Sequence, residues 1–206
     1  MNLLTRLKCA LWMLALLTAC PVPAEAAEIS NLTNLVDQFT STSNSTGDAK
    51  LKALADELSS KIEKLNQSTE KDTATKDQLS SALQALVGGK SVEALATFNK
   101  LSKAKLTPAQ TRLAKETWNL GSAYVVHKDL GALEGAQGDV AEIVKALRVG
   151  EAAKALPAIQ KVAKEATLTA GQKQLLTSLA EQYAPGIGKL GESLDGLKKN
   201  IPGLGK

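Results

Sequence analysis

The chain has 206 residues, of which 44% are hydrophobic, 3% are aromatic and 22% are charged, and its formal net charge is +4 at pH 7. Ala, Leu, Lys, Gln and Glu are prominent and aromatic residues are scarce, so the composition predicts an all-α protein. Lysines alternate with acidic residues instead of gathering in a basic block, which is typical of a solvated surface and speaks against nucleic-acid binding.

Residues 1–26 have the pattern of a secretory signal peptide. Arg6 and Lys8 give a positive start, and the apolar run at 9–19, which is 11 residues long, is too short to cross a bilayer as a mature helix. Ala24 and Ala26 supply the small residues that signal peptidase requires. We therefore expect an exported bacterial protein, periplasmic or extracellular.

A second cleavage site stays open. The segment Leu17-Thr18-Ala19-Cys20 resembles a bacterial lipobox, which would make Cys20 a possible lipidation site and the protein a membrane-anchored lipoprotein. We favour the unlipidated form, because no long polar tether follows Cys20. Either cleavage leaves no disulfide and no free thiol, which excludes thiol catalysis and cysteine metal sites. Cleavage after residue 26 reduces 25 basic residues to 23 and 21 acidic residues to 20.

Residues 27–72 are expected to form an N-terminal helical pair. In the first helix, Ile29, Leu32, Leu35, Val36 and Phe39 share one face, and the polar stretch 41–48 predicts a loop. Asp48 is placed to cap the second helix, and a further polar connection is expected over 66–75. The second helix carries one apolar stripe, made of Leu51, Leu54, Leu58, Ile62 and Leu65.

The sequence after residue 72 contains an internal repeat. Residues 79–104 align with 140–165 at an offset of 61, and 106–113 align with 168–175 at an offset of 62. Eleven positions are identical in this register, among them the pairs Gly89/Gly150, Thr107/Thr169 and Gln110/Gln172. We therefore predict two three-helix repeats of about 61 residues, over 73–134 and 135–185.

The identical residues predict helix boundaries instead of a chemical site. Thr107 with Gln110, and Thr169 with Gln172, have the spacing of a capping box at a helix start. Gly89 and Gly150 are each placed where a helix ends in the left-handed conformation before the next helix begins.

The spacing of a glycine, a small residue and a large apolar residue in Gly89–Ala94–Phe98 and Gly150–Ala155–Ile159 resembles that of a tetratricopeptide repeat. The resemblance covers about a quarter of the chain. Where the family has Trp, Leu-Gly and Tyr, this chain has Gln78, Ser81-Ala82 and Ala85. It implies a helical array similar to that family, and the chain also resembles small exported bacterial helical-repeat proteins of undefined function, which adds no activity.

Candidate catalytic groups are few. His127 is the only histidine, and although Asp129 lies nearby, no nucleophile or second metal ligand accompanies it; we expect a structural histidine near a helix end. The aromatic residues lie at helical positions typical of a core, and VGGK at 87–90 lacks the residues of a phosphate-binding loop. No pair stands out among the carboxylates Glu93, Glu116, Glu134, Glu142 and Glu151. We expect no catalytic, cofactor-binding or metal-binding residues.

The C-terminal tail, residues 186–206, is the segment expected to interact. Its apolar residues recur at helical spacing, its opposite face is lysine-rich, and its many glycines would weaken an isolated helix. Two interpretations stay open: a terminal cap docked on the protein's own repeats, or an amphipathic contact with a partner or a membrane. The expected contact residues are Ile187, Leu190, Leu194, Leu197, Ile201, Leu204, Lys189, Lys198 and Lys199.

The sequence thus favours an exported, non-catalytic helical scaffold or protein-binding module of the bacterial cell envelope, with an unknown protein partner. The alternative is a membrane-surface protein held by the tail and by a lipid on Cys20. An enzyme that uses only carboxylates is the third and least favoured hypothesis.

Overall fold

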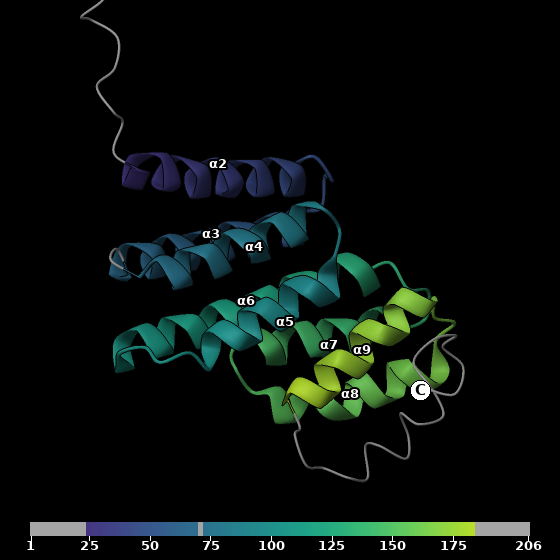
Figure 1. Cartoon of the computed structure of the whole chain (residues 1–206). Helices are drawn as coiled ribbons and strands as arrows, with labels where there is room; N and C mark the ends of the chain where they lie inside the picture. Colours follow the sequence, from purple (N-terminus) through teal and green to yellow (C-terminus); the bar gives the residue numbers. More distant parts are fainter. Residues whose placement is uncertain (1–23, 70–71, 184–206) are drawn as a thin grey trace, which may run out of the picture. The chain divides into compact units, whose positions relative to one another are not determined.

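The computed structural model is all-α, as predicted (Figure 1). It describes residues 24–69 and 72–183, with side-chain burial from residue 31 onward. The predicted signal peptide, Cys20 and the tail therefore lie outside the described residues, apart from the short stretch 24–26. The described helices are α2 (Ala24–Asn44), α3 (Ala49–Ser68), α4 (Thr73–Val87), α5 (Ser91–Ser102), α6 (Pro108–Leu130), α7 (Gln137–Arg148), α8 (Ala152–Glu165) and α9 (Ala170–Tyr183).

The chain divides into two units, residues 1–31 and 32–206, and the packing described below is that of the second unit. Its centre is α6, against which α3, α5 and α7 pack closely. The core is built from leucine and alanine with few aromatic rings, and Phe39 and Phe98 are its largest fully buried side chains. Figure 1 shows α3 and α7 on opposite sides of α6, an arrangement that positions the candidate site.

The loop predicted at 41–48 is wrong in its first half, because α2 continues to Asn44. The extension is held by side-chain hydroxyls. Ser43 Oγ donates to Phe39 O at 2.9 Å and lies 2.9 Å from the hydroxyl of Tyr124 on α6. Since the single hydroxyl hydrogen of Ser43 is used on Phe39, Tyr124 donates to Ser43. A serine that the sequence assigns to a loop is thus buried against another helix.

The predicted start of α3 is confirmed. Asp48 is its N-cap, and its side chain accepts from the backbone N–H groups of Lys50 and Leu51. All five residues of the predicted apolar stripe are buried. The polar connection predicted at 66–75 is shorter than expected, since α3 runs to Ser68 and α4 starts at Thr73. Asp72 caps α4 through the backbone N–H of Thr75, which explains the earlier start.

The two glycine turns are confirmed and alike. Gly89 has φ +73° between α4 and α5, and Gly150 has φ +77° between α7 and α8. The residue after each glycine donates its backbone N–H back into the preceding helix, Lys90 to Ala85 O at 2.8 Å and Glu151 to Ala146 O at 2.9 Å. Glycine is required because this left-handed backbone disfavours side chains.

Both predicted capping boxes form. Thr107 N donates to Gln110 Oε1 at 3.0 Å, and Thr169 N donates to Gln172 Oε1 at 2.9 Å. Each glutamine also donates its Nε2 to the end of an earlier helix, Gln110 to Ser68 O on α3 and Gln172 to Asp129 O on α6. The same side chain therefore starts one helix and anchors it to another.

The stretches 73–134 and 135–185 each hold three helices, α4–α6 and α7–α9. Ala94, Ala155, Phe98 and Ile159, which carry the resemblance to tetratricopeptide repeats, are fully buried. The stretches differ in their third helix, because α6 packs closely on α5 while α9 makes a smaller contact with α8. The two-repeat organisation and its boundaries remain an interpretation of the sequence.

Candidate protein-binding groove

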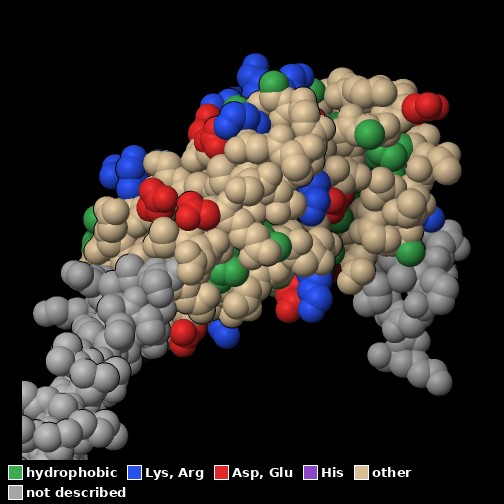
Figure 2. All heavy atoms as spheres, turned by 90° about the horizontal axis from the view of Figure 1, so that it is seen from above, with side chains coloured by type: hydrophobic (Ala, Val, Ile, Leu, Met, Phe, Trp, Pro, Cys, Tyr) green, Lys and Arg blue, Asp and Glu red, His purple; other side chains and the backbone are tan. Residues whose placement is uncertain are grey.

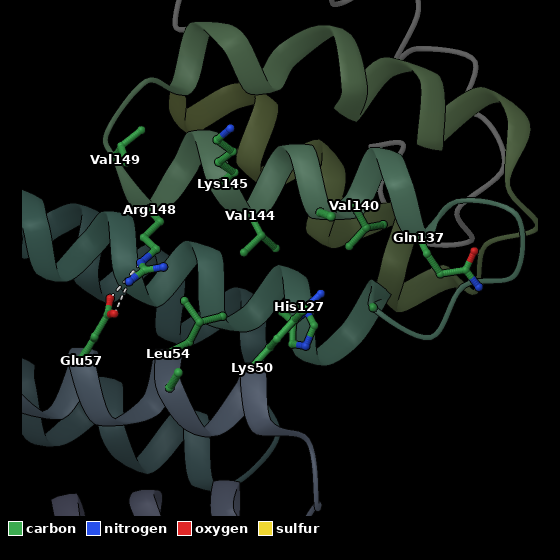
Figure 3. Close-up of a pocket in the computed structure, with 13 residues that line it drawn as sticks. Lys50, Leu54, Glu57, His127, Gln137, Val140, Val144, Lys145, Arg148 and Val149 are labelled. Carbon is green, nitrogen blue, oxygen red and sulfur yellow. Dashed lines mark hydrogen bonds and ion pairs between the residues drawn. The ribbon is translucent and has the colours of Figure 1, made fainter.

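A hollow of about 690 Å³ lies between α3 and α7, and we call it the α3–α7 groove (Figure 3). It is lined mainly by residues of α3 from Lys50 to Glu57, by residues of α7 from Gln137 to Arg148, and by His127 of α6. The groove exists because both helices pack on α6 with little contact between each other. Its volume is in the range of natural ligand sites.

The floor and lower walls of the groove are apolar. Leu54 and Val140 are buried, with exposed fractions of 5% and 1%, and Val144 is half-buried. Ala53 and Ala141, both exposed, line the groove from α3 and α7 respectively. Val149, directly after α7, also lines the groove and is 63% exposed, the only large hydrophobic side chain so exposed among the described residues. An apolar partner surface would be desolvated on binding here.

One end of the groove is closed by an ion pair between α7 and α3. Arg148 Nε donates to Glu57 Oε2 at 2.9 Å, and Arg148 Nη2 donates to the other carboxylate oxygen (Figure 3). The bidentate geometry fixes both side chains. Both are partly exposed, so the pair contributes less than about 1 kcal/mol to stability. Its main consequence is a polar side-chain bridge from α7 to α3 at this end of the groove.

The other end is lined by His127, whose ring contacts Asp48, the N-cap of α3. Nε2 of His127 lies 2.8 Å from Oδ2 of Asp48, while Oδ1 of Asp48 accepts from Lys50 N and Leu51 N. The hydrogen bond from the backbone N–H of Leu51 lowers the pKa of Asp48 most. Burial opposes it as the second-largest effect, and contacts with His127 and Lys50 each lower the pKa by less. His127 thus lies in the last turn of α6, near a helix end as expected, and its hydrogen-bond partner is Asp48, not Asp129.

The groove carries excess positive charge. Its lining has the cations Lys50, Lys145 and Arg148 against one carboxylate, Glu57. Glu57 is engaged by Arg148, whereas no ion pair or hydrogen bond of the Lys50 or Lys145 side chain occurs within the described part of the chain. Figure 3 shows these two lysines on opposite walls, Lys50 on α3 and Lys145 on α7. Elsewhere charges are mixed, and Figure 2 shows a face on which acidic and basic side chains lie beside one another.

The carboxylates considered in the sequence are dispersed over the helices. Glu93 pairs with Lys90, Glu151 pairs with Lys154, and Glu116 pairs with Lys61. A smaller hollow of about 370 Å³ between α2 and α3 is lined by Asp37, Asp56 and Glu63, and Asp56 is paired with Lys52. In residues 24–69 and 72–183, no group of three or more His, Cys, Asp or Glu side chains is arranged to hold a metal ion.

The aromatic residues of the described helices lie in the interior or between helices, as expected. Phe98 and Tyr124 are buried. Trp118 of α6 stacks on Tyr183 of α9, with ring centroids 4.2 Å apart and planes inclined by 7°. The Tyr183 hydroxyl donates to Ser122 Oγ at 2.9 Å, and burial raises the pKa of Tyr183. This pair fastens α9 to α6.

Sequence reasoning did not find the groove. Its walls come from segments about 90 residues apart, and neither shows a motif. The available signal was weak. It consisted of two valines, Val144 on α7 and Val149 directly after it, that the structure leaves half-buried and exposed. The predicted tail contacts, from Ile187 to Leu204, and the possible lipidation site Cys20 lie outside the described residues.

Comparisons with known proteins add no further constraint. No protein-family model matches the chain, and neither a curated protein nor a solved structure matches it. Over the described helices, none has the combination of length and apolar composition needed to cross a membrane.

Proposed function

We propose that this protein is an exported, non-catalytic helical scaffold of the bacterial cell envelope, and that it binds a segment of a partner protein in the α3–α7 groove. The observation that carries the proposal is an open groove with an apolar floor of Leu54, Val140 and Val144. Export rests on the signal pattern of residues 1–26.

The side chains around the groove favour binding over catalysis. Its single carboxylate, Glu57, is held by an arginine, and His127 is held by an N-cap aspartate. A general acid–base mechanism needs a group free to exchange a proton with the substrate. We therefore rank a carboxylate-based enzyme lowest.

The experiment is crosslinking of the protein in its native envelope, followed by identification of the captured proteins. The groove is filled by the double variant Ala53→Gln/Ala141→Gln, which adds bulk on both walls without changing charge. The matched control is Ala96→Gln/Ala153→Gln, which changes two exposed alanines of α5 and α8 outside the groove. Loss of one specific protein in the groove variant alone is the expected result. Its retention in both variants would contradict the proposal.

The alternative is a membrane-surface protein, held by the amphipathic tail and by a lipid on Cys20. The regular apolar spacing from Ile187 to Leu204 favours it. Flotation with neutral liposomes, with and without residues 186–206, separates the two. Salt-independent flotation that requires the tail would favour the membrane function, and capture that survives truncation after Pro185 would favour the groove.

A further inference from the structure

We propose that the occupant of the α3–α7 groove is a short amphipathic helix of a partner protein, with carboxylates on both sides of its apolar face. This inference rests on the proposed function and specifies the chemistry of the partner.

The dimensions of the groove fit about two helical turns. At a rise of 1.5 Å per residue, the wall from Lys50 to Glu57 is about 10 Å long. The ion pair Arg148–Glu57 closes one end, and His127 with Asp48 marks the other. A helix of this length presents apolar side chains at positions i, i+3 or i+4, and i+7 toward one face. Such a row fits the apolar floor formed by Leu54 and Val144.

The charges on the two walls specify the flanks of the bound helix. Lys50 and Lys145 are the lining cations not engaged by a described acidic group, and they stand on opposite walls (Figure 3). A helix with a carboxylate on each side of its apolar face meets one lysine on each side. A fatty acid or a similar amphiphile has a single anionic headgroup, so it would leave one of the lysines without a counterion.

The same charges argue against the protein's own tail as the occupant. Residues 186–206 contain four lysines and two acidic residues, a net charge of +2. The groove lining has three lysine or arginine side chains and one carboxylate. Like charges on the two surfaces oppose association, so electrostatic complementarity favours an acidic segment of another protein.

The lysines are expected to act mainly on encounter and specificity. Their side chains are exposed at the groove rim, where ion pairs contribute modest affinity but accelerate association and select the sign of the partner's charge. Most of the binding energy would come from the apolar floor. Binding is therefore expected to weaken with salt but not to disappear.

The test uses three synthetic helical peptides of the same length and the same leucine face, with flanks of Glu, Gln or Lys. Each is labelled and titrated with the full mature chain by fluorescence polarisation. The Glu peptide is expected to bind at least about tenfold more tightly than the Lys peptide at low salt. The charge-reversed variant Lys50→Glu/Lys145→Glu is expected to invert that order.

The matched control is Lys64→Glu/Lys115→Glu, which makes the same change in net charge at exposed positions outside the groove lining. It is expected to preserve the order of the three peptides. The groove-filling variant Ala53→Gln/Ala141→Gln is expected to weaken all three.

Several outcomes would overturn the inference: equal binding of the Glu and Lys peptides, an unchanged order in Lys50→Glu/Lys145→Glu, or no binding of any peptide. Tight binding of oleate or of phosphatidylglycerol vesicles that depends on these lysines, without peptide binding, would also overturn it in favour of an amphiphile. If native crosslinking still shows groove-dependent capture while the peptides fail, the proposed function stands and only the acidic-helix inference is lost.

Discussion

Asp48 joins two helices at one end of the groove, so its replacement has a predictable cost. One carboxylate oxygen accepts from Lys50 N at 2.8 Å and from Leu51 N at 3.1 Å, which caps α3. The other lies 2.8 Å from Nε2 of His127 in the last turn of α6. The variant Asp48→Ala removes both functions, whereas Asp48→Asn keeps an acceptor for the cap and removes the charge.

The magnitudes follow from the two functions. Loss of an N-cap side chain costs about 1 kcal/mol of unfolding free energy. The pair with His127 is partly exposed, with side-chain fractions of 15% for His127 and 44% for Asp48. The structure shows this contact as a hydrogen bond, and at such exposure its contribution is at the low end of the roughly 0.5–1.5 kcal/mol of a typical hydrogen bond. We therefore expect Asp48→Ala to lower the free energy of unfolding by roughly 1–2 kcal/mol and Asp48→Asn by about 0.5 kcal/mol.

The deficit of Asp48→Asn should depend on pH in a defined direction. The backbone N–H of Leu51, with smaller contributions from His127 and Lys50, holds the pKa of Asp48 below its ordinary value of 3.8. A folded-state pKa below the unfolded one stabilises the protein fully above pH 3.8, and this stabilisation is lost as the pH falls through the lowered value. The deficit is therefore expected at neutral pH and should vanish in strong acid.

The assay is urea unfolding followed by circular dichroism, at about pH 7 and about pH 2. Asp77→Asn, an exposed aspartate of α4, is the control for the removal of one negative charge. The reasoning would be refuted if Asp48→Asn matched the wild type at neutral pH, or if its deficit were undiminished in acid.

Three further predictions test the packing around the site. Ser43→Ala leaves the buried Tyr124 hydroxyl without its acceptor and should lower the free energy of unfolding by about 1–3 kcal/mol. Adding Tyr124→Phe to Ser43→Ala should lower it hardly any further. Additive losses in a double-mutant cycle, measured by urea unfolding, would contradict the hydrogen bond. Burial raises the pKa of Tyr183 above its ordinary value of 10.0. The protonated side chain therefore stabilises the fold fully below pH 10.0, and this stabilisation is lost as the pH rises through the raised pKa. Tyr183→Phe should lose less unfolding free energy than the wild type as the pH rises, and parallel curves would count against this. Replacing either glycine of the left-handed turns by Ala should lower the free energy of unfolding by about 1 kcal/mol or more. In thermal unfolding, Gly150→Ala should be more destabilising than Gly89→Ala, because an added Cβ meets Nδ2 of Asn119 at 2.8 Å at Gly150 and nothing within 4 Å at Gly89. The reverse order would refute this.

Local signals in the sequence were sufficient for the helix boundaries that they encode. The cap at Asp48, the boxes that begin at Thr107 and Thr169, and the turns at Gly89 and Gly150 all formed where predicted. Each depends on groups within about five residues, so the residues that specify the bond are adjacent in the chain. The apolar stripe of α3 was equally readable, because its period reports which face is buried.

Where two side chains in contact are far apart in the chain, the prediction from sequence was wrong or absent. Ser43 lies in the unexpected last turn of α2 and contacts Tyr124, 81 residues away, whereas the composition of that stretch alone predicted a loop. His127 has Asp129 two positions away, yet it pairs with Asp48, 79 residues away. No local pattern records which distant side chain will lie opposite.

The sequence by itself determined an all-α chain, its caps and its glycine turns, because hydrogen bonds between near neighbours fix them. Only the tertiary structure decided the α3–α7 groove. Its ion pair joins Arg148 to Glu57 across 91 residues, and Lys50 and Lys145 line the same groove only because α3 and α7 both pack on α6. A binding surface assembled from three helices depends on how those helices pack, and that information is distributed over the whole core.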